Sequence, residues 1–321
     1  MKKKLTFFIF MLIVFIAGCQ PAHETPNPLV VNLTPPAGMQ VVQGKLLNQV
    51  ARLEDALPRA GTEGFVVPTD EQKNIFSVIV AGLNENRPLE ALTSATQNGY
   101  DLLWYSDAND GNAISYVLRE TDPSLRGWGL YIFRVASASN VILEAPHPLS
   151  DEGTPALSVD LYRALDARAV LIAGAHRDAN AGGSADAAHN PQTIFQAVHE
   201  SEVGQIFNAN QTPIVLQIHG FAASKHPDYP HVIVSYEHSG VINLADLLAG
   251  QMVENKIVAA LKSLGIKVGT CNGGEWRDLC GQTNVQSELM TRGIFIHIEL
   301  DETIRDKSKK FIEAMVAALT E

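Results

Sequence analysis

The segment PIVLQIHGF, residues 213–221, is an apolar run that ends in a histidine followed by a glycine. Its short length and its β-branched residues predict a buried strand rather than a helix. The segment IFIHIEL, residues 294–300, has the same character. The other expected strands are Tyr100–Tyr105, Ala113–Arg119, Gly127–Val135, Asn140–Leu143, Ala169–Ile172, Val232–Ser235 and Ile266–Gly269.

From about residue 140 onward, helix-like segments separate the expected strands. This alternation predicts an α/β fold, in which a mixed, mostly parallel sheet is flanked by helices on both faces. No linker interrupts residues 60–321, so we expect residues 37–321 to form a single catalytic domain with a helical lead-in at 37–60. The other expected helices are Glu71–Leu83, Ser158–Leu165, Pro191–Ile206, Asn243–Leu264 and a final helix from Ile304 to Leu319.

The composition of the 321 residues is that of a folded globular protein, with 46% hydrophobic and 18% charged residues. The net charge is -11, and removal of residues 1–18, which carry three lysines and no acidic residue, takes it to -14. Binding to nucleic acid through phosphate contacts requires a basic surface, so we expect no nucleic-acid partner. Beyond the first 18 residues, no apolar run is long enough to span a bilayer.

Residues 1–18 have the pattern of a secretory signal peptide, because Lys2–Lys4 precede the apolar run Leu5–Ile16. The end of this segment, Ala17-Gly18-Cys19, resembles the bacterial lipobox. That resemblance implies cleavage before Cys19 and acylation of this cysteine. A plain signal peptide and an uncleaved anchor helix are the alternatives.

Residues 19–36 are rich in proline, asparagine and threonine, which is typical of a flexible, extended tether. A lipidated cysteine at its start would attach the domain to a membrane. We therefore expect a lipid-anchored protein of the bacterial cell envelope. Gln20, which follows the cysteine in place of aspartate, implies the outer membrane if the source is Gram-negative.

Cys271 and Cys280 are the two remaining cysteines. In an exported chain an even pair is normally a disulfide, which would close a short loop here. Free thiols or a metal-binding pair are the alternatives, although no second cysteine pair is present to complete a zinc site made only of cysteines.

Nine of the ten histidines lie between His147 and His297, and several follow expected strands. His147 and Glu152 come from one loop after a strand, and His219 ends the strand quoted above. Two imidazoles and one carboxylate form a common catalytic zinc site with an open fourth position. We therefore predict one zinc ion bound by His147, Glu152 and His219, with chance occurrence of the three as the alternative.

Glu299 lies within the apolar strand at 294–300. Burial of a carboxyl group is costly unless the group is used or paired, and it raises the pKa toward neutrality. We predict that Glu299 is the general base of a hydrolase, with His297 on the same face of the strand. A structural ion pair with Arg292 or Arg305 is the alternative.

In their order along the chain, these motifs resemble the poly-γ-glutamate hydrolase branch of the zinc carboxypeptidase-like fold. They are also similar to N-formylglutamate amidohydrolases and, more distantly, to zinc N-acetylmuramoyl-L-alanine amidases. The resemblance covers residues 140–305 and implies zinc ligands at His147, Glu152 and His219 and a general base at Glu299. Classical zinc carboxypeptidases space the first histidine and glutamate more tightly, so carboxypeptidase specificity is not implied.

The segment AGAHRDAN, residues 173–180, follows another expected strand. Arg177 is suited to a bidentate contact with a substrate carboxylate, and Asn180 could line the same rim. An ordinary salt bridge is the alternative role for Arg177.

Together these features predict an exported zinc-dependent amidohydrolase or peptidase. Its expected partners are a membrane and a small peptide or amide substrate, which an envelope location would associate with the cell wall. The first alternative is a non-catalytic lipoprotein that binds a ligand or partner on a degenerate hydrolase fold. A serine hydrolase is a weaker alternative, because the chain has no G-x-S-x-G motif.

Overall fold

The computed structural model describes residues 33–236, 243–271 and 275–320. The expected signal peptide, Cys19 and most of the expected tether lie outside these residues. Pro35–Glu321 form one compact unit. Among the described residues, no helix combines the length and the apolar character needed to cross a membrane.

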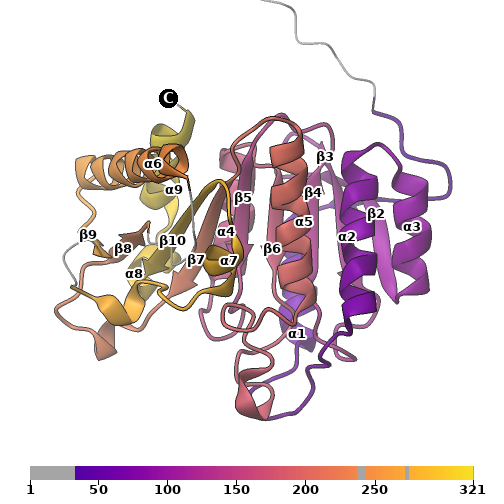
Figure 1. Cartoon of the computed structure of the whole chain (residues 1–321), viewed down its shortest axis with the longest axis horizontal. Coiled ribbons are helices and arrows are strands. Elements are labelled where there is room, and N and C mark those ends of the chain that lie inside the picture. The colour runs from indigo at the N-terminus through magenta and orange to yellow at the C-terminus, as the bar shows by residue number, and fades with distance from the viewer. Residues whose placement is uncertain (1–32, 237–242, 272–274, 321) are drawn as a thin grey trace, which may run out of the picture. The chain divides into compact units, whose positions relative to one another are not determined.

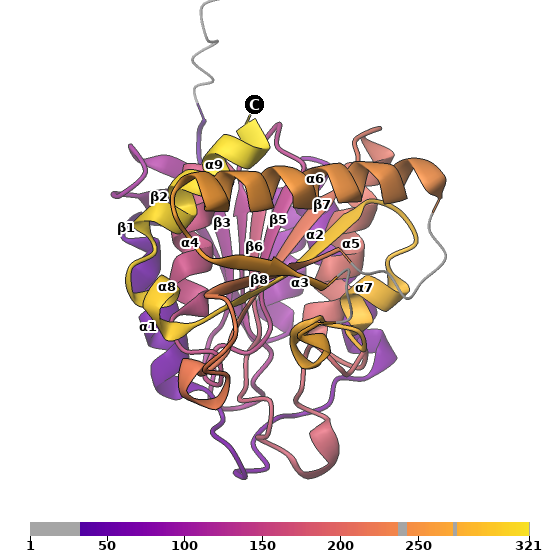
Figure 2. The same ribbon diagram turned by 90° about the vertical axis from the view of Figure 1, so that its left-hand side faces the viewer.

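The described residues contain a ten-stranded sheet with the order β1-β2-β3-β4-β6-β5-β7-β10-β8-β9. Neighbouring strands β6, β5, β7 and β10 run parallel at its centre, whereas β4 and β8 pair with them antiparallel. The strands are β1 (Gln40–Gly44), β2 (Tyr100–Asp107), β3 (Ala113–Glu120), β4 (Leu130–Arg134), β5 (Val141–Ala145), β6 (Ala169–Ile172), β7 (Ile214–Gly220), β8 (Val232–Ser235), β9 (Val268–Thr270) and β10 (Ile294–Leu300). β8 and β9 end the sheet on the side that faces the viewer in Figure 2.

Helices pack on both faces of the sheet, as the alternating sequence pattern predicts (Figure 1). One face is covered by α1 (Leu46–Ala56), α4 (Thr154–Ala164), α6 (Leu244–Ser263) and α9 (Lys309–Thr320). The other is covered by α2 (Asp70–Asn84), α3 (Pro88–Gln97) and α5 (Ile194–Asn208), with the short α7 (Val285–Leu289) beside α5. The expected α/β class, with a mixed sheet between helices, is confirmed.

Alternation along the central strands separates an apolar face from a partly polar one. In β7, Leu216 and Ile218 belong to the core under α4, α6 and α9, whereas Val215 belongs to the core under α2 and α5. Gln217 and His219 therefore project to the same face as Val215. The polar side chains near the carboxyl ends of the central strands therefore lie on this one face of the sheet.

Several elements differ from the sequence-based expectations. The lead-in at 37–60 contains the edge strand β1 before α1 begins at Leu46. Helix α3 was not expected, because its buried residues are Ala91 and Ala95, which give a weak apolar stripe. The expected final helix is divided into α8 (Glu302–Asp306) and α9.

Candidate metal centre and catalytic site

The central parallel strands bring the main candidate residues to one edge of the sheet. His147 follows β5 by two residues, His219 lies near the end of β7, and Glu299 lies near the end of β10. These strands are neighbours, and the register pairs His219 directly with Glu299. All three side chains line one cavity of about 450 Å³. The carboxyl ends of parallel strands are where ligand sites form in α/β proteins.

The loop after β5 supplies Asp151, rather than the expected Glu152, to this cavity. The amide of Asp151 donates to the carbonyl of His147 (2.9 Å), which closes one helical turn between β5 and α4. A residue four positions after His147 therefore returns to its side of the chain, and the next residue points away. Glu152 is exposed, and its charge contributes to raising the pKa of Glu54, behind the larger effect of burial.

His147, Asp151 and His219 form a compact group of metal-ligating atoms. One oxygen of Asp151, Oδ2, lies 3.3 Å from His147 Nδ1 and 3.1 Å from His219 Nδ1. The three ligand atoms are all within 4.8 Å of one another, and all three residues are buried. Ligands around a tetrahedral zinc ion are about 3.3 Å apart, so the group has the donor types and spacing that zinc requires.

The second nitrogen of each histidine faces a separate acceptor. His147 Nε2 lies 2.8 Å from Asp186 Oδ1, and His219 Nε2 lies 2.8 Å from Gln217 Oε1. Metal-binding histidines usually donate their other ring N–H to such an acceptor, which fixes the tautomer. Both Nδ1 atoms face Asp151 Oδ2, which is the position that a metal ion would share.

The surroundings of His219 also fit a cation. Burial and the neighbouring His297 lower the pKa of His219 to about 3, so the ring is neutral and carries one proton. Both of its nitrogens nevertheless face oxygen atoms, those of Asp151 and Gln217. A cation between Nδ1 and the carboxylate would satisfy the nitrogen that lacks a proton.

His147 lies between two carboxylates. Burial opposes its charged form, but hydrogen bonds to Asp151 and Asp186 outweigh burial and raise the pKa of His147 to about 9. The same contacts overcome burial in the two carboxyl groups and hold the pKa values of Asp151 and Asp186 well below their usual range. Two carboxylates therefore flank His147, and one of them, Asp151, also faces His219.

A second group, His147, Asp186 and His189, also has metal-ligating atoms within 4.8 Å of one another. This group uses the opposite nitrogen of His147 and includes the exposed His189. Its carboxylate is already paired, because Arg177 Nη2 lies 2.7 Å from Asp186 Oδ2. Asp186 therefore suits the role of orienting His147 better than that of a metal ligand.

Glu299 is buried and has one oxygen available for chemistry. His297 Nε2 lies 3.3 Å from Glu299 Oε1, whereas Oε2 has no hydrogen-bond partner among the described residues. Burial raises the pKa of Glu299, against the smaller lowering effect of His297.

The alternative ion pair of Glu299 is not formed. In the part of the chain that the structure describes, no arginine makes a salt bridge with Glu299, because Arg305 donates to the carbonyls of Phe221 and Leu300 and Arg292 stacks on Phe207.

Of the two residues expected to bind substrate, only one lines the cavity. Arg177 lines the cavity, but its guanidinium pairs with Asp186. Asn180 does not line the cavity. Its side-chain amide bonds to both the N–H and the carbonyl of Phe65, at 3.0 and 2.8 Å, so it joins two backbone segments.

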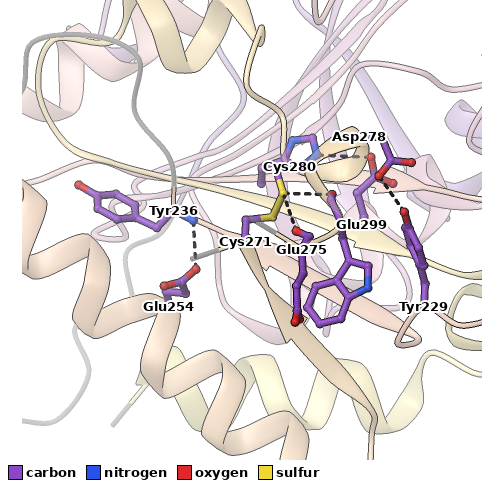
Figure 3. Close-up of a disulfide and its surroundings, with 10 residues drawn as sticks. Tyr229, Tyr236, Glu254, Cys271, Glu275, Asp278, Cys280 and Glu299 are labelled. Atoms are coloured by element: carbon purple, nitrogen blue, oxygen red, sulfur yellow. Dashed lines mark hydrogen bonds and ion pairs between the residues drawn. A yellow bond between two sulfur atoms is a disulfide. The ribbon is translucent and has the colours of Figure 1, made fainter. Parts of the chain in front are cut away.

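A disulfide-closed loop forms another wall of the cavity. Cys271 and Cys280 are bonded, as expected (Figure 3). Tyr229 donates from its hydroxyl to Asp278 in this loop at 2.9 Å. Wall residues from this loop and the segment after it include Arg277, Asp278, Gly281 and Asn284.

No protein-family model and no curated protein sequence matches this chain. Among solved structures, it is similar to a bacteriophage poly-gamma-glutamate hydrolase, with 15% identity and a TM-score of 0.38 over 57% of this chain and 84% of that chain.

It is also similar to N-formylglutamate amidohydrolase from Ralstonia eutropha JMP134, with 9% identity and a TM-score of 0.36 over 58% and 93% of the two chains. An N-acetylmuramoyl-L-alanine amidase of Nostoc punctiforme shows 12% identity and a TM-score of 0.30 over 57% and 97%. These three are the enzyme classes that the sequence motifs resemble, and at such identities the likeness concerns the fold.

Proposed function

We propose that this protein is a zinc-dependent hydrolase of an amide or peptide bond. The observation that carries the proposal is the convergence of two Nδ1 atoms on one oxygen of Asp151, beside a buried carboxyl group with a free oxygen. His147, Asp151 and His219 would hold the metal ion, and Glu299 would be the general base. Asp151 thus replaces Glu152 in the ligand set.

A bound zinc ion would supply a Lewis acid that polarises a carbonyl group and lowers the pKa of water. The residues of the chain complete the chemistry. The free oxygen of Glu299 accepts the proton of the attacking water, which its raised pKa favours, and passes it to the leaving amine. His297 holds the other oxygen of Glu299 and so keeps the free one available.

The substrate and the location belong to the same proposal. The cavity is lined by polar and charged side chains, which suits a small polar peptide or amide better than an apolar ligand. The signal-like segment at 1–18 and the lipobox-like Cys19 support export and a lipid anchor in the cell envelope. A cell-wall peptide is the substrate that such a location would provide.

Metal analysis and one variant test the function. Purified protein is expected to contain about one zinc ion per chain and to hydrolyse members of a panel of acyl-amino acids and cell-wall peptides. Glu299→Gln should keep the zinc and lose at least about 100-fold in kcat, because general-base catalysis contributes 10²–10⁴-fold.

Protein that hydrolyses its substrate without metal would contradict the proposal. Zinc-loaded protein with no activity on the whole panel, and with ligand binding unchanged by Glu299→Gln, would instead support the non-catalytic alternative.

A further inference from the structure

A network of buried polar side chains continues from His219 into the protein interior. Its centre is Gln217, which is two residues earlier in β7 and fully buried. Gln217 Oε1 accepts from His219 Nε2 at 2.8 Å and also from the side-chain amide of Asn284. Gln217 Nε2 donates to Glu144 Oε2 at 2.9 Å and to Gln286 Oε1 at 3.1 Å. All four hydrogen-bonding positions of the Gln217 amide are thus satisfied, and Glu144 and Gln286 are fully buried with it, whereas His219 and Asn284 line the cavity.

The orientation of the Gln217 amide is determined by its neighbours. Glu144 Oε2 accepts from Gln217 Nε2, and the other oxygen of Glu144 lies 2.6 Å from His199 Nδ1. A reversed amide would place Gln217 Oε1 against the Glu144 carboxylate and its NH₂ group against that of Asn284. The oxygen of Gln217 must therefore face His219.

This arrangement has a consequence for the protonation of His219. An oxygen can only accept, so the ring nitrogen that faces Gln217 carries a proton, and in a ring with a single proton the lone pair then lies on Nδ1. We propose that Gln217, held by the Glu144–His199 pair, is the positioning residue that fixes this tautomer and keeps His219 Nδ1 open to a metal ion. The inference rests on the proposed metal centre for its role, although the tautomer itself can be measured without metal.

Without Gln217, His219 has a competing alternative. Asp151 Oδ2 lies 3.1 Å from Nδ1, so a proton on Nδ1 would form a good hydrogen bond to that carboxylate. The ring would then be blocked on the side where the metal binds. Loss of partners that orient metal-binding histidines typically costs 10- to 100-fold in metal affinity.

Three variants separate positioning from general packing. Gln217→Leu removes the acceptor. The double variant Gln217→Glu with Glu144→Gln exchanges the amide and the carboxylate, so an acceptor still faces His219 and the total charge is unchanged, while the donor to Gln286 Oε1 is lost. Gln196→Leu is the matched control, because Gln196 is equally buried and bonds to Gln286 but not to Gln217 or His219.

The measurements are ¹⁵N shifts of the histidine rings in metal-free protein, with His219 assigned by signal loss in His219→Asn, and zinc affinity by chelator competition. We expect Gln217→Leu to move the His219 proton from Nε2 to Nδ1 and to weaken zinc binding 10- to 100-fold. The double variant and Gln196→Leu should keep the Nε2–H tautomer and bind zinc within about threefold of the unmodified protein.

The inference is overturned if Gln217→Leu retains the Nε2–H tautomer, or if Gln196→Leu weakens zinc binding equally. If Gln217→Leu does not fold, the double variant provides the test. Loss of the Nε2–H tautomer in the double variant would then overturn the inference. Failure of the unmodified protein to bind zinc would contradict the proposed function, while the tautomer measurement would still test the role of Gln217.

Discussion

At the scale of single residues, the candidate site depends on which of two adjacent carboxylates faces the histidines. Asp151 is buried and lies 3.3 and 3.1 Å from two imidazole nitrogens, whereas Glu152 is exposed. In the structure, the turn that closes from the amide of Asp151 to the carbonyl of His147 returns residue i+4 to the side of that histidine. The expectation of Glu152 rested on one imidazole and one carboxylate from the same loop after a strand, and the resemblance to known motifs implied the same residue.

Adjacent substitutions test that choice directly. Asp151→Asn should lower zinc affinity by at least about tenfold, because it removes a charged ligand next to two imidazoles. Glu152→Gln is the matched control and should leave zinc affinity unchanged. Chelator competition measures both, and a larger loss in Glu152→Gln than in Asp151→Asn would restore the original ligand assignment.

Glu120 gives a pH-dependent prediction away from the site. Burial raises the pKa of Glu120 from 4.5 to about 7, although Arg126 and the amide of Trp128 bond to the carboxylate. The folded state therefore binds this proton more tightly than the unfolded state. Its stabilising contribution is complete below about pH 4.5 and is lost as the pH rises through about 7.

Glu120→Gln stays neutral and lacks this dependence. Between pH 4.5 and 8, the free energy of unfolding of the unmodified protein should fall relative to that of the variant by up to about 3 kcal/mol. Urea unfolding at several pH values measures this difference. A constant difference would show that the ion pair with Arg126 keeps the pKa near its ordinary value.

At the scale of elements, β5, β7 and β10 determine where the site lies. Their parallel order puts His147, His219 and Glu299 at one edge, although the residues are up to 152 positions apart along the chain. The apolar pattern of these strands predicted their burial, and their terminal polar residues predicted the site. The pairing of β5 with β7 was not predictable, because strand order depends on long-range packing.

The disulfide-closed loop supports a prediction at the same scale. A bond that closes a loop of about ten residues stabilises the fold by about 2–3 kcal/mol in the chain-entropy model. Replacement of both Cys271 and Cys280 by serine should lower the free energy of unfolding by this amount in urea. Serine at both positions avoids an unpaired thiol, and unchanged stability would show that Tyr229 and neighbouring contacts hold the loop alone.

At the scale of the whole molecule, Pro35–Glu321 form one compact unit that contains every proposed metal-binding and catalytic residue. A protein limited to residues 35–321 should therefore fold and bind zinc as the full chain does. Circular dichroism and metal analysis check this expectation. Loss of folding would show that residues before Pro35 contribute to the core.

The lipid anchor is a separate prediction for the full chain. If Cys19 is acylated, Cys19→Ser should move the protein from the membrane fraction to the released fraction of cells, since the acyl chains supply the attachment. Fractionation with immunodetection measures the shift. Membrane association that is unchanged in Cys19→Ser would favour an uncleaved anchor helix.

The sequence by itself determined the alternation of strands and helices, the disulfide pair and the histidines and glutamate at strand ends. These features depend on periodicity and on local spacing, which each segment carries independently of the rest. Only the tertiary structure decided that Asp151 rather than Glu152 faces the two histidines, that Arg177 is occupied by Asp186, and that Gln217 faces His219. Most of these residues lie close to their partners in the sequence, but contacts with distant segments fix their orientation, such as Asp151 with His219 and Gln217 with Glu144. These orientations depend on how the buried polar groups satisfy one another once the sheet has formed.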